Sequence, residues 1–153
     1  MLLHQFKKLS IRSKRVSVSN ALSAKDVEVV RSPDTVAEMI RKVIDEDREQ
    51  VISILLDIRN QPLGFYLVAV GSIDRCMVDM REVFRAAVML SSSAIVIAHN
   101  HPSGDHSPSS EDLGLTERAV AAGKILGIPV LDHVIVSESG YTSLREQGVL
   151  NFL

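Results

Sequence analysis

The residues most able to do chemistry gather in one short segment, where three of the five histidines lie within eight positions. His99 and His101 stand two residues apart at the end of an apolar run that is typical of a buried strand. Positions i and i+2 of an extended chain project to the same side, so both imidazoles can reach one ion from a rigid base. Neutral imidazole is a good ligand for zinc and other borderline metals. The spacing therefore indicates a metal site.

A third candidate ligand comes from the residues that follow this strand. A catalytic zinc site needs three protein ligands and one open position. Asp112 falls in the first turn of the next expected helix, and the loop with Pro102, Gly104 and Pro108 turns the chain back toward the strand end. Two simpler interpretations compete: a lone His-x-His pair is weak evidence for a metal, and Ser109-x-x-Asp112 can be only a helix capping box.

Together these residues carry a resemblance to a known family. The pattern His99-x-His101, seven residues, Ser109, two residues, Asp112 resembles the JAMM metalloprotease motif of JAB/MPN domains. The seven residues that begin at His99 read His-Asn-His-Pro-Ser-Gly-Asp and resemble the RadC branch of that superfamily. Two further segments share the likeness, Arg81 to Phe84 and Gly127 to His133, and the resemblance extends from about Val27 to Glu146.

The resemblance implies a zinc-dependent hydrolase that cleaves amide, peptide or isopeptide bonds. The family's two histidines and aspartate bind Zn²⁺, which would place the metal on His99, His101 and Asp112. Its serine, here Ser109, would stabilise a tetrahedral oxyanion near the reacting water. Its glutamate, a general acid/base at the start of the strand after the first helix, corresponds to Glu49. From the residues alone Glu49 can equally be an exposed turn residue, and other acids lie near element ends: Asp45, Glu46, Asp47 and Glu82.

Hydrophobic periodicity predicts the elements that must position these residues. We expect strands over residues 27–30, 51–56, 65–70, 94–98, 130–136 and 141–144, with the second and third forming a hairpin. We expect helices opened by Ser32-Pro33-Asp34, from Asp79 to Leu90 with Val83, Phe84, Ala87 and Val88 on one face, and from Ser109 to Leu126. This order predicts an α/β or α+β fold. The resemblance implies a single JAB/MPN-like domain, a mixed central sheet flanked by helices in cytidine-deaminase-like layers.

Several polar residues near the motif have less certain roles. Asn100 is expected to point away from the two histidines and to brace the loop. Asp105 and His106 can support the metal ligands, because ligating histidines usually donate their second nitrogen to an oxygen; for His106 a solvent-exposed loop position is the simpler interpretation. His133, next to Asp132 in an apolar strand, is better explained as a hydrogen-bonded structural histidine than as a fourth ligand.

Composition excludes several function classes for the 153-residue chain. The single cysteine, Cys76, excludes an intramolecular disulfide, zinc sites on paired cysteines and the zinc deaminases, and it favours a cytoplasmic location. No apolar stretch approaches the ~20 residues of a membrane span. The first residues lack the apolar region of a secretory signal. We therefore expect neither a membrane span nor a secretory leader.

The net charge of −2 is unevenly distributed. Residues 1–25 carry a charge of +6 without any acid, and the rest of the chain sums to −8. We expect a flexible basic arm over 1–25 and a RadC-like domain over 26–153. The arm supports an alternative function, a non-catalytic DNA- or protein-binding module linked to DNA repair, although a solvated terminus is simpler. Nucleic-acid contacts would come from Lys7, Lys8, Arg12, Lys14 and Arg15.

Overall fold

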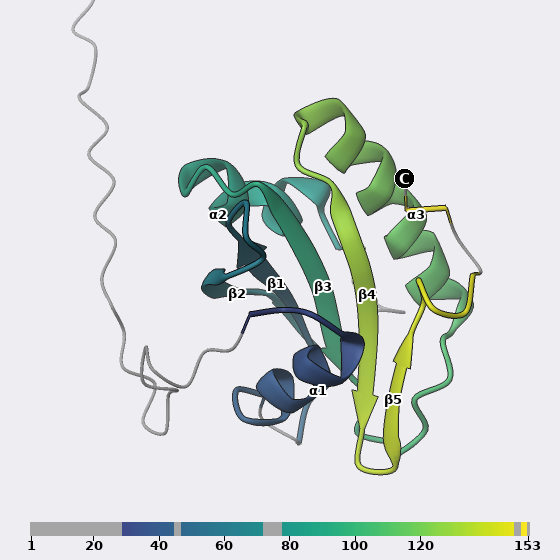
Figure 1. Ribbon diagram of the computed structural model, residues 1–153. Helices are drawn as coiled ribbons and strands as arrows, with labels where there is room; N and C mark the ends of the chain where they lie inside the picture. The colour runs from purple at the N-terminus through teal and green to yellow at the C-terminus, as the bar shows by residue number, and fades with distance from the viewer. Residues whose placement is uncertain (1–28, 45–46, 72–77, 149–150, 153) are drawn as a thin grey trace, which may run out of the picture.

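A computed structural model describes residues 29–44, 47–71, 78–148 and 151–152 of the chain (Figure 1). These residues form three helices and five strands. In chain order the elements are α1 (Pro33–Arg41), β1 (Gln50–Leu56), β2 (Pro62–Val70), α2 (Met80–Met89), β3 (Ala94–Asn100), α3 (Ser110–Leu126), β4 (Val130–Ser137) and β5 (Gly140–Ser143). The expected basic arm and Cys76 lie outside the described residues.

The strands form one mixed sheet in the order β2-β1-β3-β4-β5. β3 and β4 are parallel, and the other neighbouring pairs are antiparallel. The expected hairpin of β1 and β2 is therefore confirmed. β3 lies at the centre of the sheet, where His99 stands opposite Val51 on one side and Ile135 on the other.

Helices cover both faces of this sheet (Figure 1). Ile95 and Ile97 of β3 pack on the side of α2 and α3, whereas Val96 and Ala98 pack on the side of α1. Because both faces are covered, β3 is buried along its whole length, which explains its continuous apolar run. The layers confirm the expected α/β class with a mixed sheet flanked by helices.

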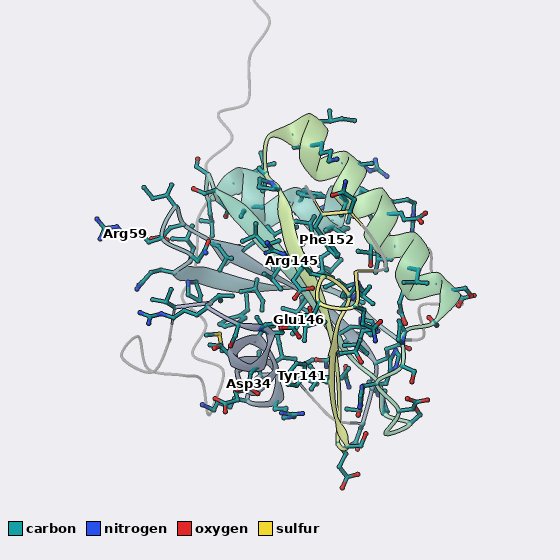
Figure 2. The ribbon with its side chains drawn as sticks, turned by 45° about the vertical axis from the view of Figure 1, so that its right-hand side comes forward. Asp34, Arg59, Tyr141, Arg145, Glu146 and Phe152 are labelled. Atoms are coloured by element: carbon teal, nitrogen blue, oxygen red, sulfur yellow. The ribbon has the colours of Figure 1, made fainter. Side chains whose placement is uncertain are left out.

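Residues near the C-terminal end of the described chain contribute to the hydrophobic cores on both faces of the sheet. Tyr141 of β5 packs against the α1 side, and Figure 2 shows it near Asp34 in the first turn of α1. Phe152, close to the C-terminus, packs into the α2–α3 side (Figure 2). The hydrophobic cores on both faces of the sheet thus include residues that are distant in sequence.

Short-range signals begin and end the helices as expected. The Ser32 side chain accepts a hydrogen bond from the Thr35 backbone N–H at the start of α1. The Asp79 side chain accepts from the Arg81 N–H at the start of α2. Gly127 ends α3 in the left-handed region at φ 69°, which glycine adopts without strain.

Two local predictions are wrong. Of the strand expected over residues 27–30, residues 27 and 28 lie outside the described residues, and Val29 and Val30 form no strand; the Val30 N–H instead bonds the Asn60 carbonyl in the β1–β2 turn at 2.9 Å. A β-branched run sets only a local preference, and a strand also needs a free edge beside it. Val88 is 55% exposed, because at 100° per residue it lies roughly 90° from the centre of the buried stripe of α2.

Candidate metal centre

Four side chains from different segments converge at one end of β3. One ligand atom from each of Glu49, His99, His101 and Asp112 lies within 4.8 Å of all the others. The antiparallel register of β1 and β3 pairs Val51 with His99, so the residue two before Val51 comes opposite His101. The loop after β3 returns the chain to α3, whose first turn carries Asp112. We call these four residues the metal cluster.

The donor atoms of the metal cluster have the spacing of a tetrahedral site. His99 Nε2 is 2.9 Å from His101 Nε2 and 3.1 Å from Asp112 Oδ1. His101 Nε2 is 3.4 Å from Asp112 Oδ2. Ligand atoms about 2.0–2.1 Å from zinc in a tetrahedron stand about 3.3 Å apart. Two imidazole nitrogens and a carboxylate at these separations fit Zn²⁺.

The second ring nitrogen of His101 fixes which of its nitrogens can bind a metal. His101 Nδ1 lies 2.8 Å from the backbone oxygen of Asp105, which can only accept a hydrogen bond. The ring proton therefore sits on Nδ1, and Nε2 presents its lone pair to the metal cluster. Support for His101 thus comes from the Asp105 carbonyl, while the Asp105 carboxylate accepts from the Ser107 N–H.

A buried chain of hydrogen bonds does the same for His99. The Thr116 hydroxyl donates to the Asp112 carbonyl at 2.6 Å, so its oxygen accepts from His133 Nδ1, also at 2.6 Å. Neutral His133 then accepts at Nε2 from His99 Nδ1, 2.7 Å away. Burial, with the neighbouring His99, lowers the pKa of His133 well below its usual value and keeps it neutral. His99 therefore also presents an Nε2 lone pair.

This series of hydrogen bonds includes one residue that was predicted from the sequence and one that was not. His133 is the hydrogen-bonded structural histidine expected from its apolar strand, and its neighbour Asp132 accepts from the Ser143 hydroxyl at 2.6 Å. Thr116 was missed, because only the packing of α3 beside β4 brings it to His133. A polar residue four positions after Asp112, on the same helix face, was the available signal.

The position of Asp112 is compatible with both interpretations of its spacing from Ser109, the helix capping box and the candidate metal ligand. The capping box is present: Asp112 Oδ2 accepts from the Ser109 N–H and hydroxyl, each at 2.7 Å, and the Asp112 N–H donates to Ser109 Oγ. The same carboxylate faces both histidines. Burial raises the pKa of Asp112, but its interactions with the neighbouring His101 and His99 and the hydrogen bonds from Ser109 outweigh it, so the net pKa is low. The carboxylate is therefore held in its ionised form.

The candidate general bases in the described part of the chain differ in whether they lie in the metal cluster. Glu49 is half-buried and belongs to the metal cluster, whereas Asp47 is exposed outside it. Glu82 accepts from the Tyr66 hydroxyl at 3.0 Å and pairs with Arg85. Asp45 and Glu46 lie outside the described residues.

The preferred interpretation of His106 is wrong. His106 is half-buried, and its Nδ1 lies 2.7 Å from Thr142 Oγ1 of β5. Its ring also packs over Gly140, where an added Cβ would come within 3.1 Å of Nε2. The loop after β3 is thus attached to the β4–β5 hairpin through this ring.

A cavity of about 400 Å³ adjoins the exposed side of His101. It lies between the C-terminal end of α1 and the β4–β5 turn, with Ile40 and Val136 among its apolar lining. The Arg41 guanidinium at its edge donates to the carbonyl oxygens of Ser137 and Gly140. Of the metal cluster, His101 alone lines this cavity, so a molecule bound there would contact the cluster through His101.

Comparisons with known proteins agree with this arrangement. The profile of the RadC-like JAB domain matches residues 30–149. A UPF0758 protein of Methanosarcina barkeri is 44% identical over 121 residues, 79% of this chain and 53% of that protein. UPF0758 proteins of Aquifex aeolicus and Moorella thermoacetica are 43% and 45% identical, over 79% and 80% of this chain and 52% and 54% of their own length. The chain thus spans about half the length of these relatives.

The structure also bears on whether a helix could span a membrane. Within the described part of the chain, none of the helices is both long and apolar enough to cross a bilayer.

Proposed function

The chain belongs to the RadC-like JAB domain family, and we propose that it is a zinc-dependent hydrolase of JAMM type that cleaves peptide or isopeptide bonds. The observation that carries this proposal is the convergence of Glu49, His99, His101 and Asp112 within 4.8 Å. Three of these residues provide a ligand set that leaves a coordination position open, and the fourth is a carboxylate within reach of it.

The metal would be held by His99 Nε2, His101 Nε2 and the Asp112 carboxylate. When bound, zinc supplies Lewis-acid chemistry: it lowers the pKa of water toward ~7 and polarises a carbonyl. The chain's own contribution begins with the ligand atoms, whose lone pairs are directed inward because each Nδ1 is bonded elsewhere. This arrangement removes the need to reorganise the rings during the reaction.

Glu49 is the proposed general acid/base. Its carboxylate takes the proton of the attacking water as the water oxygen bonds to the carbonyl carbon. The C–N bond then breaks, and Glu49 delivers the same proton to the leaving amine. The half-buried position of Glu49 suits this role, because the residue is partly shielded from water and its carboxylate lies within the cluster.

Ser109 is proposed to donate its hydroxyl to the tetrahedral oxyanion of the substrate. In the resting arrangement that hydroxyl donates to Asp112 Oδ2 at 2.7 Å. A rotation about χ1 would redirect it to the substrate, and the Ser109 backbone N–H would keep its own bond to the carboxylate. Ser109 therefore orients a ligand before the reaction and contributes a donor during it.

The test combines metal content with hydrolysis. Protein purified without chelators is assayed for zinc and for cleavage of peptide and isopeptide libraries. We expect about one zinc per chain, loss of both zinc and activity in His99→Ala, and loss of activity with retained zinc in Glu49→Gln. A zinc-free wild type, or a His99→Ala variant with full activity, contradicts the proposal.

A second candidate function, DNA binding, rests on residues 1–25, which carry a charge of +6 and lie outside the described residues. Phosphate contacts by this segment would make binding steeply salt-dependent. Unchanged DNA affinity after deletion of residues 1–25 would rule out this role for the segment.

A cytoplasmic location is proposed on the single cysteine, which suits a reducing compartment.

A further inference from the structure

The side chain of Asn100 continues the pairing of β1 and β3 beyond the point where their backbone register ends. The last backbone pair of the two strands is Val51 with His99. The next contact is made by the Asn100 carboxamide: its Nδ2 donates to the Arg48 carbonyl at 2.8 Å, and its Oδ1 accepts from the Gln50 N–H at 2.8 Å. Asn100 is 7% exposed, so water competes little for these bonds.

The two bonds lie on either side of Glu49. In extended backbone the carbonyl of residue i−1 and the N–H of residue i+1 face one neighbouring strand, and the groups of residue i face the other. Accordingly, Arg48 and Gln50 bond Asn100 on the β3 side, whereas the Glu49 carbonyl accepts from the Gly71 N–H at 2.8 Å next to β2. The backbone that carries the Glu49 side chain is therefore fixed from both sides.

Asparagine is suited to this task because its carboxamide has the donor and acceptor of a peptide group. An aspartate in its place would retain the acceptor for Gln50 and lose the donor for Arg48. The Asn100 amide bonds Gln50 at the start of β1 and Arg48 two residues before it, rather than the loop after β3 that we expected it to brace.

We infer that Asn100 is a positioning residue for Glu49: it holds the backbone of residues 48–50 in the arrangement that keeps the Glu49 carboxylate within the metal cluster. This inference rests on the proposed function only for the consequence of misplacing Glu49. A displacement of about 1 Å at a reacting group costs up to about a hundredfold in rate. Asn100 thus acts on proton transfer and leaves zinc binding to the three ligands.

The experiment compares Asn100→Ala and Asn100→Asp with a matched control, Ser53→Ala. Ser53 is a fully buried residue of β1 whose hydroxyl donates to the Val83 carbonyl at 2.9 Å, away from the cluster. Each variant is measured for zinc affinity, for amide hydrogen exchange at Gln50, and for the position of the Glu49 carboxylate in a crystal structure. Where wild type cleaves a library peptide, kcat and KM on that peptide are added.

We expect zinc affinity to stay within about threefold in every variant, since the ligands are untouched. In Asn100→Ala the Gln50 amide exchanges faster and the Glu49 carboxylate moves out of the cluster. Its kcat falls about ten- to a hundredfold with KM unchanged. Asn100→Asp keeps the Gln50 amide protected and shows an intermediate loss, and Ser53→Ala keeps wild-type kcat.

An Asn100→Ala variant with Glu49 in place and full kcat would overturn the inference. An equal loss of kcat in Ser53→Ala would also overturn it, because general destabilisation would then explain the effect. If zinc-loaded wild type cleaves nothing, the proposed function fails, and the position of Glu49 in Asn100→Ala still decides the inference.

Discussion

Replacing Thr116 by valine should weaken zinc binding, although Thr116 touches neither the metal nor the reacting atoms. The Thr116 oxygen is the acceptor that keeps the proton of His133 on Nδ1. Valine has the same shape and no acceptor, so this buried N–H loses its partner. His133 then gains by carrying its proton on Nε2, which faces His99 Nδ1. That change pushes the His99 proton onto Nε2, the atom that we propose binds the metal.

The size of the effect follows from the cost of an unsatisfied buried donor. Thr116 and His133 are both 0% exposed, so no water replaces the lost acceptor. Such a donor costs about 1–3 kcal/mol, and each 1.4 kcal/mol is about tenfold in an equilibrium constant. Zinc must recover this energy to bind His99, which gives a loss of about 5- to 140-fold in affinity, a span that includes the loss of about 10- to 100-fold usual for residues that support metal ligands.

The assay is a competition titration of zinc against a chromophoric chelator, with wild type, Thr116→Val and two controls. Thr116→Ser keeps the hydroxyl and should restore the affinity. Thr142→Val removes another Thr–His hydrogen bond, that to His106 Nδ1, which is not connected to His99, and should leave the affinity unchanged. A folded Thr116→Val protein with wild-type zinc affinity would refute the hydrogen-bond chain as the support of His99.

Three further predictions test other parts of the structure. Ser109→Ala should lower the free energy of unfolding by about 1 kcal/mol and Ser109→Gly by only a few tenths, because glycine is a better N-cap; both should lose activity in the hydrolysis assay, and full activity in the glycine variant would exclude a role for the hydroxyl. Gly123→Ala should destabilise by about 1–3 kcal/mol in urea unfolding, since an added Cβ would lie 2.6 Å from the Ile128 carbonyl oxygen, whereas the intrinsic preference of helices predicts a gain of about 1 kcal/mol. Burial raises the pKa of Asp132 above 3.8, so the folded chain binds more protons than the unfolded chain between the two pKa values, and stability falls as pH rises through that window; Asp132→Asn should flatten this part of the profile, and an unchanged profile would show that Asp132 does not produce it.

The convergence of the candidate metal ligands His99, His101 and Asp112 was predictable because their geometry is local. Two histidines at i and i+2 at a strand end must face one side, and a capping box places Asp112 at a helix start whether or not a metal binds. Glu49 was identified only through the family resemblance. The position of Glu49 beside the histidines depends on the register of β1 against β3, which is a long-range pairing. The sequence alone does not show which of several neighbouring acids that register brings to the histidines.

The features that the sequence did not reveal are tertiary contacts. From the sequence Thr116 looks like an ordinary helix residue until α3 packs beside β4. Asn100 looks like a residue between two candidate ligands until β1 lies alongside it. His106 looked exposed because nothing local indicates that β5 returns to the loop. The strand expected at Val29 and Val30 failed for the opposite reason: the local preference was present, but the Val30 N–H bonds the Asn60 carbonyl of a turn rather than a neighbouring strand.

The central claim is that His99, His101 and Asp112 hold one zinc ion, and anomalous diffraction from zinc-loaded crystals tests it most directly. The account predicts a single strong peak at the zinc edge among His99 Nε2, His101 Nε2 and the Asp112 carboxylate, about 2.0–2.2 Å from each. The absence of a peak there, in crystals where zinc is bound elsewhere or not at all, would contradict it.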